Sequence, residues 1–258
     1  MIFVLTDFGL RASYMGQMAA VMHRSAPEVP VVTLTAHAPS FDPYRSAYLL
    51  AAESAVARPG DVVLAVADPG VGTARTPIAL RADGVWYVAP DNGLTSVVAR
   101  RAAVVETFKI AWRPERLSAS FHGRDLFAPT ATALARGVTA GLEPAPASTI
   151  GADWPAELDQ VVFIDDYGNA MTGRRAATLE AETALDVPGV EAPLARLRTF
   201  ADDAAAIGFW YENAIGLVEI AARESSAAAR FDLAVGTPVT PVPLPAAGAA
   251  PTIQVGGA

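Results

Sequence analysis

The chain has 258 residues and 52% of them are hydrophobic, enough for one large domain or two smaller ones with sizeable cores. Its net charge of −8 argues against a nucleic-acid or anionic-membrane partner, because both bind basic surfaces. The lack of cysteine excludes disulfides, thiolate metal sites and thiol nucleophiles, and the three histidines have no metal-ligand spacing. The chain enters a strand at once and has only short apolar runs, so we expect a cytoplasmic protein without a membrane span.

Strands alternate with helices over residues 1–138. Strands are expected at 2–5, 31–34, 62–67, 77–81, 85–89 and 102–108, and helices at 13–25, 44–57, 93–101 and 125–136. The run at 62–67 is continuously apolar, which is typical of a strand buried on both faces. The Asp83-Gly84 pair predicts a tight hairpin between the fourth and fifth strands. This alternation predicts an α/β domain with a mostly parallel sheet and helices on its faces.

The pattern changes after residue 138. Residues 139–157 are rich in Pro, Ala and Ser without a clear period, and we interpret them as a linker. Residues 158–245 hold short, turn-separated strands, which indicate a smaller β domain. These strands are expected at 160–164, 207–211, 216–222, 231–235 and 239–245. The tail at 246–258 is expected to be flexible.

Polar clusters follow the predicted strands of the first half, at the edge where α/β folds bind ligands. Asp7, in TDFG at 6–9, can accept hydrogen bonds from ribose hydroxyls or can simply hold a turn. Asp68 and Arg75 begin and end the stretch DPGVGTAR, whose glycines let a ligand approach the backbone. The two charges can equally form a structural salt bridge over a tight turn. The stretch lacks the Gly-Lys-Ser/Thr of a phosphate-binding loop.

Three further clusters are candidates for a role in the site. His122, in FHGRDLFAP at 121–129, stands where a loop enters a helix, and it can be catalytic or structural. PDNG at 90–93 has turn chemistry, and a capping role suffices to explain it. DDYGN at 165–169 can be only a hairpin turn, or its ring and amide can hold a flat heterocycle.

Taken in order, these clusters resemble one family, the S-adenosyl-L-methionine (SAM) hydroxide adenosyltransferases, or adenosine-forming SAM hydrolases. Fluorinating and chlorinating SAM enzymes are related to that family. The matching stretches run from residue 6 to residue 221 and so cover both predicted domains. They are TDFG at 6–9, DPGVGTAR at 68–75, PDNG at 90–93, FHGRDLFAP at 121–129, DDYGN at 165–169 and NAIGLVEIA at 213–221.

The resemblance implies hydrolysis of SAM to adenosine and L-methionine, with SAM as substrate and no cofactor or metal. It implies an α/β domain followed by a C-terminal β-barrel, and a homotrimer with SAM between the N-domain of one subunit and the C-domain of the next. The family's catalytic triad falls on Asp68, Arg75 and His122, and its ribose-binding aspartate on Asp7. The substrate contacts implied for the C-terminal domain are Asp165, Tyr167, Asn169, Asn213 and Ala227.

Two positions indicate whether the chain resembles the hydrolases or the halogenases among these related enzymes. The halogenases carry Tyr or a similar residue where Asp68 stands, and the fluorinating enzyme carries Ser at the position of Gly123. An anionic Asp68 would repel a halide and orient water, which favours hydrolysis over a halogenase or a non-catalytic SAM- or adenosine-binding protein. The chain departs from the family pattern at substrate contacts, while the triad is intact. The departures are Ala12, residues 33–36, Tyr167, Ala214 and Ser225-Ser226.

Overall fold

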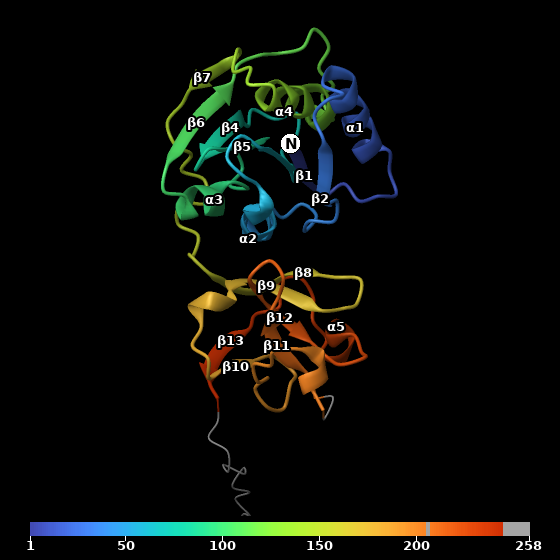
Figure 1. The fold of residues 1–258 in the computed structure, drawn as a ribbon, viewed down its shortest axis with the longest axis vertical. Helices are drawn as coiled ribbons and strands as arrows, with labels where there is room; N and C mark the ends of the chain where they lie inside the picture. The colour runs from blue at the N-terminus through green and yellow to red at the C-terminus, as the bar shows by residue number, and fades with distance from the viewer. Residues whose placement is uncertain (205–206, 245–258) are drawn as a thin grey trace, which may run out of the picture.

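The computed structural model describes residues 1–204 and 207–244, which form two parts stacked along the long axis of the molecule (Figure 1). The N-terminal part is a seven-stranded sheet with helices on both faces, and the C-terminal part is a smaller antiparallel β unit. The tail expected at 246–258 lies outside the described residues. No helix in the described chain is long and apolar enough to cross a bilayer.

The large sheet confirms the expected α/β class. Its strand order is β2-β1-β3-β5-β4-β6-β7, and the pairs β1–β2, β1–β3 and β3–β5 are parallel. Strand β4 runs antiparallel to β5 and β6 and is the first arm of the predicted hairpin, whose turn has positive φ at Asp83 and Gly84. The strands are β1 Ile2–Thr6, β2 Val31–Thr35, β3 Val62–Val66, β4 Pro77–Ala82, β5 Val85–Pro90, β6 Val105–Ile110 and β7 Leu142–Pro144.

Helices cover both faces of this sheet. Helices α1 (Tyr14–Ser25) and α4 (Ala128–Ala135) pack on one face, in a core that includes Met18, Met22 and Phe127. Helices α2 (Pro43–Glu53) and α3 (Ser96–Arg101) pack on the other face. All five residues of β3 are buried, as its apolar run predicts. The carboxyl end of β3 is therefore a fixed platform for the residues that follow it.

The structure differs from the sequence expectations at residues 142–144 and 231–235. The segment interpreted as a linker contains β7, which pairs antiparallel with β6 and extends the large sheet. A three-residue edge strand ending in proline has no periodicity to distinguish it from a loop. No strand forms at 231–235, because the chain turns there after α5 (Ala227–Arg230), with Asp232 at φ 52° and the Leu233 amide bonded to Ala228 O.

The C-terminal part closes into a small barrel. A four-stranded sheet has the order β11-β12-β9-β8, and β10 pairs with β13. The circuit closes through bridges at Gln160 with Pro238, Leu185 with Leu194, and Arg196 with Trp210. The buried Trp210 belongs to the enclosed core. The strands are β8 Leu158–Ile164, β9 Ala170–Arg175, β10 Thr183–Asp186, β11 Phe209–Glu212, β12 Leu217–Ala221 and β13 Thr240–Pro243.

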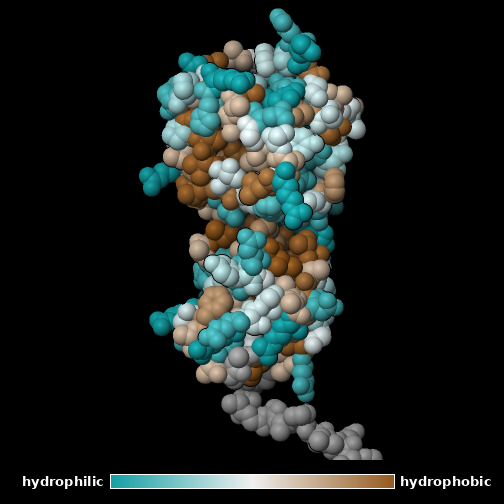
Figure 2. Space-filling view, turned by 90° about the vertical axis from the view of Figure 1, so that its right-hand side faces the viewer, coloured by the Kyte–Doolittle hydropathy of each residue, from teal (hydrophilic) through white to brown (hydrophobic). Residues whose placement is uncertain are grey.

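Helix α2 joins the two parts. Tyr48 donates a hydrogen bond to Pro155 O at 2.6 Å, and Arg45 donates to Gln160 Oε1 at 2.7 Å. A small apolar cluster that includes Val97 and Val162 fills the space between these contacts. On the face shown in Figure 2, hydrophobic residues gather near the level where the two parts meet.

Candidate active site

The site is built around an ion pair at the carboxyl end of β3. Nε of Arg75 donates to both carboxylate oxygens of Asp68, at 3.0 and 2.9 Å, and Nη2 also contacts Oδ2. The side chains are only 4% and 9% exposed for Asp68 and Arg75 respectively. The Arg75 guanidinium lies over the ring of Phe127, 5.1 Å from its centroid. A buried, bidentate pair of this kind holds both charges in one geometry.

Loop geometry explains how this pair reaches the next segment of the site. Gly72 has φ 80°, and a Cβ atom on it would lie 2.6 Å from the carbonyl oxygen of Ala119. Only glycine allows the 68–75 loop to pass so close to the 118–122 segment. Asn92 fixes the other side, since its amide donates to Ala67 O at 2.8 Å. Its Oδ1 also accepts from the Leu94 amide at 3.2 Å, in keeping with the turn expected at 90–93.

His122 completes the array, and its partner fixes its tautomer. Nη2 of Arg75 lies 2.9 Å from Nδ1 of His122. A guanidinium has only N–H donors, so Nδ1 must accept and the ring proton must sit on Nε2. Burial and the adjacent Arg75 charge lower the pKa of His122, which favours the same neutral imidazole. His122 can therefore donate a hydrogen bond through Nε2 but has no free lone pair with which to take a proton.

A π-helical turn at Gly123–Phe127 holds the imidazole in place and continues into α4. Arg124 donates to Asp125 Oδ1 at 2.6 Å and to Gln17 of α1 at 2.8 Å. Asp125 in turn accepts from the Ser118 amide at 2.9 Å. These contacts fasten the segment on both sides of His122. Single π turns inside helices often occur at functional sites.

An apolar wall that the sequence did not reveal lies beside His122. The rings of Phe8, Tyr14 and Phe121 contact one another, with centroids 5.1 to 5.9 Å apart. A Cβ on Gly123 would lie 3.2 Å from Met18 Sδ and 3.4 Å from the Phe8 ring. Glycine at this position therefore lets the Phe8 and Phe121 rings approach the backbone of the residue that follows His122.

Asp7 follows β1, next to the end of β3. Its Oδ2 accepts from the Phe41 amide at 3.1 Å. Burial raises the pKa of Asp7, and the nearby charge of Asp68 adds to that rise. Phe41 adopts φ 59°, rare for a bulky residue, and its side chain is 79% exposed. Phe41 could not be predicted as a site residue, because neither its backbone conformation nor its exposure can be inferred from local composition.

The residues expected in the C-terminal domain form a second group. Asp165 Oδ1 accepts from the amides of Tyr167 and Asn169 at 2.9 and 2.8 Å, and Oδ2 accepts from the Asn169 side chain at 3.0 Å. Tyr167 is 82% exposed. The turn lines a cavity of about 740 Å³ together with Tyr211 and other residues of the C-terminal part.

Ala227 and Asn213 have different positions relative to this cavity. Ala227 is buried at the start of α5, and its neighbours Ser225 and Ser226 line the cavity. The Ala228 amide donates to Gly168 O at 2.8 Å, which holds α5 against the turn. Asn213 caps the hairpin between β11 and β12 and lines a different hollow, with Arg196 and Arg198.

In the described part of one chain, the cavity beside the Tyr167 turn and the hollow between the two parts are not lined by the first group of residues. Asp7, Asp68, Arg75 and His122 lie on the N-terminal part, whereas the 740 Å³ cavity is lined by C-terminal residues. A separate hollow of about 520 Å³ between the two parts is lined by residues 33–37 and 163–166, among others, and not by the triad.

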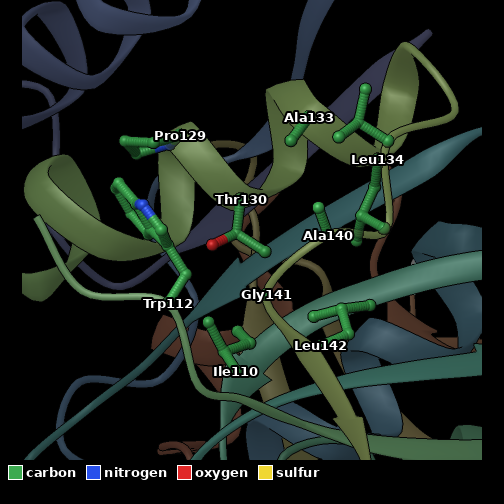
Figure 3. A pocket seen from close by; sticks show the side chains of 10 residues that line it. Ile110, Trp112, Pro129, Thr130, Ala133, Leu134, Ala140, Gly141 and Leu142 are labelled. Carbon is green, nitrogen blue, oxygen red and sulfur yellow. The ribbon is translucent and has the colours of Figure 1, made fainter.

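A further cavity lies between α4 and the β6–β7 edge (Figure 3). It has a volume of about 310 Å³, and its lining is apolar apart from Thr130, whose hydroxyl donates to Leu126 O. It has no titratable side chain and thus no acid or base to offer. In the described part of the chain, no cluster of three or more His, Asp or Glu side chains could hold a metal ion.

The fold and site define a class: an α/β domain with a strand-end carboxylate, guanidinium and imidazole array, followed by a small β-barrel. The sequence matches the SAM hydroxide adenosyltransferase N-terminal domain over residues 2–142 and the C-terminal domain of the same family over 159–240. The chain therefore belongs to the SAM hydroxide adenosyltransferase family.

Similar proteins agree with this assignment. The chain is 37% identical to the (R)-S-adenosyl-L-methionine hydrolase of Thermus thermophilus, over 92% of this chain and 98% of that protein. It is 36% identical to the protein of that name from Salinispora arenicola, over 90% and 93%. The structure matches that of an uncharacterized conserved protein from Thermotoga maritima with a TM-score of 0.84 at 26% identity, over 94% of this chain and 100% of that one. A conserved hypothetical protein from Thermus thermophilus matches with a TM-score of 0.74 at 33% identity, over 93% and 99%.

Proposed function

We propose that this protein hydrolyses SAM to adenosine and L-methionine by in-line attack of water on C5′ of the ribose. The carbon–sulfur bond breaks, a carbon–oxygen bond forms, and one proton is released. The observation that carries the proposal is the buried Asp68–Arg75 pair in contact with His122, near Asp7. Membership of the family and the names of its relatives support the same reaction.

The chemistry needs help at the nucleophile rather than at the leaving group. The sulfonium releases methionine as a neutral thioether, so no acid has to protonate it. Asp68 keeps lone pairs beyond those that Arg75 occupies and is the group that can accept a hydrogen bond from the attacking water. His122 donates through Nε2 and orients that water. A positioned base contributes about 10²–10⁴-fold, and alignment for attack adds to it.

Asp7 is proposed to bind the ribose hydroxyls. Its carboxylate is held from one side by the Phe41 amide and keeps a free oxygen for a ligand. The exposed Phe41 ring, next to that carboxylate, is proposed to pack against the nucleoside. The turn at 165–169, with Tyr167 and Asn169, is proposed to bind the adenine and the methionine end. Asn213 is proposed to act at the methionine end, and the backbone of Ala227 at the adenine.

The site is proposed to form between subunits of a homotrimer. The support is the separation of the two groups of residues within one chain, together with the exposed rings of Phe41 and Tyr167. In such an assembly the Tyr167 turn of a neighbouring subunit would cover Asp7 and the triad. We also propose that the enzyme needs no cofactor or metal and acts in the cytoplasm.

The relatives are named for the (R) epimer of SAM, so we propose the same epimer at the sulfonium as the preferred substrate here. Purified protein should release adenosine and methionine in equal amounts, faster from the (R) than from the (S) epimer. EDTA should not change the rate. Adenosine should remain the product in halide buffer, because the anionic Asp68 repels a halide.

Two results would overturn the proposal. Formation of 5′-halo-adenosine would make the protein a halogenase. Tight binding of SAM without any product would make it a non-catalytic SAM-binding protein.

A further inference from the structure

A buried carboxylate that the proposed reaction does not use lies in β12. Glu219 is 2% exposed, and it lies directly opposite Tyr211 in the register of β11 and β12. Its neighbours Val218 and Ile220 point into the barrel core, so Glu219 lies on the opposite face of the sheet. A buried carboxylate costs stability unless donors satisfy it, so its partners indicate what it does.

The hydrogen-bond donors around Glu219 have a fixed polarity. Asn213 Oδ1 accepts from the backbone amides of Ile215 and Leu217, at 3.1 and 2.9 Å. The amide nitrogen of Asn213 is thereby turned toward Glu219, and it donates to Oε2 at 2.7 Å. The other oxygen, Oε1, accepts from the hydroxyl of Tyr211. The polarity of Asn213 is thus set by backbone amides that cannot reverse. Burial raises the pKa of Glu219, and in its ionised form Glu219 can only accept from Tyr211.

The hydroxyl proton of Tyr211 is committed to Glu219. Burial raises the pKa of Tyr211, and its hydrogen bond to Glu219 adds to the rise, so the phenol stays protonated. Tyr211 also lines the 740 Å³ cavity and packs against Phe200, with ring centroids 5.4 Å apart. Toward a ligand in this cavity, the Tyr211 oxygen can therefore act only as a hydrogen-bond acceptor.

The charge of the cavity lining also favours a ligand that donates hydrogen bonds, as an accepting Tyr211 requires. Its lining includes the carboxylates of Asp165, Asp166 and Glu224 and no lysine or arginine. Such a cavity favours groups that carry N–H donors over groups that present a carbonyl oxygen. Both ends of SAM carry such donors, at the adenine 6-amino group and at the methionine amino group.

We infer that Tyr211, oriented by Glu219, selects the ligand of this cavity by accepting a hydrogen bond from one of its amine N–H groups. This rests on the proposed function for the identity of the ligand, and it assigns specificity to Tyr211 and a positioning role to Glu219. Tyr211 touches the ligand, whereas Glu219 acts through it.

The substitution Glu219→Gln reverses the polarity at Tyr211. Asn213 can donate only to an oxygen, so the new amide must turn its oxygen to Asn213 and its nitrogen to Tyr211. The Tyr211 oxygen then accepts from that amide, and its hydroxyl proton becomes free to point into the cavity. Tyr211 changes from an acceptor to a donor, while the size and packing of the side chains stay the same.

The reaction products give a test that needs no turnover. Adenosine and inosine differ at C6, where an amine is replaced by a carbonyl, and methionine and 4-(methylthio)butanoate differ by the amino group. Calorimetry at mildly alkaline pH would give the affinity ratio of each pair for the wild type, Glu219→Gln and Tyr211→Phe. Glu53→Gln is the matched control, since Glu53 is a half-buried carboxylate at the end of α2, away from the cavity.

We expect the wild type to prefer the amine-bearing member of one pair. That preference should fall about tenfold in Tyr211→Phe, the worth of one hydrogen bond, and at least as far in Glu219→Gln. The pair that responds identifies which amine Tyr211 meets. The control should keep the wild-type ratio.

Equal ratios in the wild type and Tyr211→Phe would overturn the inference, even if Glu219→Gln fails to fold. So would an unchanged ratio in a folded Glu219→Gln protein, or an equal fall in Glu53→Gln. Failure of the wild type to hydrolyse SAM would instead contradict the proposed function, and the product affinities would still test the role of Tyr211.

Discussion

Asp68 and Arg75 are nearly inaccessible to water, and this burial sets the effect of removing either charge. Asp68→Asn leaves the Arg75 guanidinium buried without its counter-charge, which costs about 3–5 kcal/mol of folding stability for a buried pair. It also removes the proposed acceptor for the attacking water, so we expect kcat to fall about 10²–10⁴-fold. Denaturant unfolding and steady-state kinetics would measure the two effects.

The ion pair between Asp159 and Arg174 provides the control, because it is also bidentate but lies in the barrel and is more exposed. Asp159→Asn should leave kcat unchanged. Wild-type kcat in Asp68→Asn would exclude the carboxylate from the reaction.

Protonation of His122 should make the folding stability depend on pH. Its pKa lies below the ordinary value of 6.5, because burial and Arg75 disfavour the charged ring. The unfolded chain therefore binds a proton at higher pH than the folded chain does. The contribution of His122 to stability is complete above that ordinary value and is lost as the pH falls through the lowered pKa.

Activity should also fall as the pH falls, since a protonated His122 ring cannot accept a hydrogen bond from Arg75 at Nδ1. The pH profile of kcat/KM should show an acid limb with an apparent pKa below 6.5. His122→Asn keeps an acceptor for Arg75 but does not titrate, so it should lower the rate and abolish this limb. An unchanged limb in the variant would assign it to another group, with Asp7 the first candidate because its pKa is raised.

Among the secondary-structure elements, the 68–75 loop positions the array, and glycine is the residue that lets it do so. Gly72→Ala would place a methyl group 2.6 Å from the Ala119 carbonyl oxygen, so the loop must shift. Because Arg75 moves with the loop, we expect kcat to fall about 10²-fold, the usual effect of a displacement of about 1 Å at a reacting centre.

Gly60→Ala separates this effect from backbone strain. Gly60 has φ 95° but no atom within 4 Å of its Cβ position. Both variants should lose about 1–2 kcal/mol of stability to the left-handed backbone, and only Gly72→Ala should lose activity. Thermal unfolding and kcat of the two proteins check this, and equal losses of activity would show that strain alone is responsible.

These elements also show how much of the site and the fold could be predicted from the sequence. The apolar run of β3 and the polar cluster after it predicted where Asp68 would lie and that Arg75 could pair with it. The contact of Arg75 with His122, 47 residues away in sequence, could not be predicted, because it depends on the close approach at Gly72. Strand β7 escaped prediction because its order comes from its partner β6 rather than from its own three residues.

At the scale of the whole molecule, the architecture separates the catalytic array from the cavity proposed to bind the substrate. Each chain contains both the array and the cavity, but the proposed site combines the array of one subunit with the cavity of another. Light scattering should then give the mass of a trimer in solution. A trimer alone would not show that sites are shared, so the stronger test is to mix two defective subunits.

Asp68→Asn would lower kcat about 10²–10⁴-fold, and Tyr167→Ala would raise KM by removing an exposed ring. In randomly mixed trimers with shared sites, about a quarter of the sites combine an intact Asp68 with an intact Tyr167 from its neighbour. Co-expression of the two variants should therefore restore a kinetic phase with the wild-type KM, which neither variant shows alone. If each chain formed its own site, every Asp68 in the mixture would face a defective turn, and only the high-KM phase would appear.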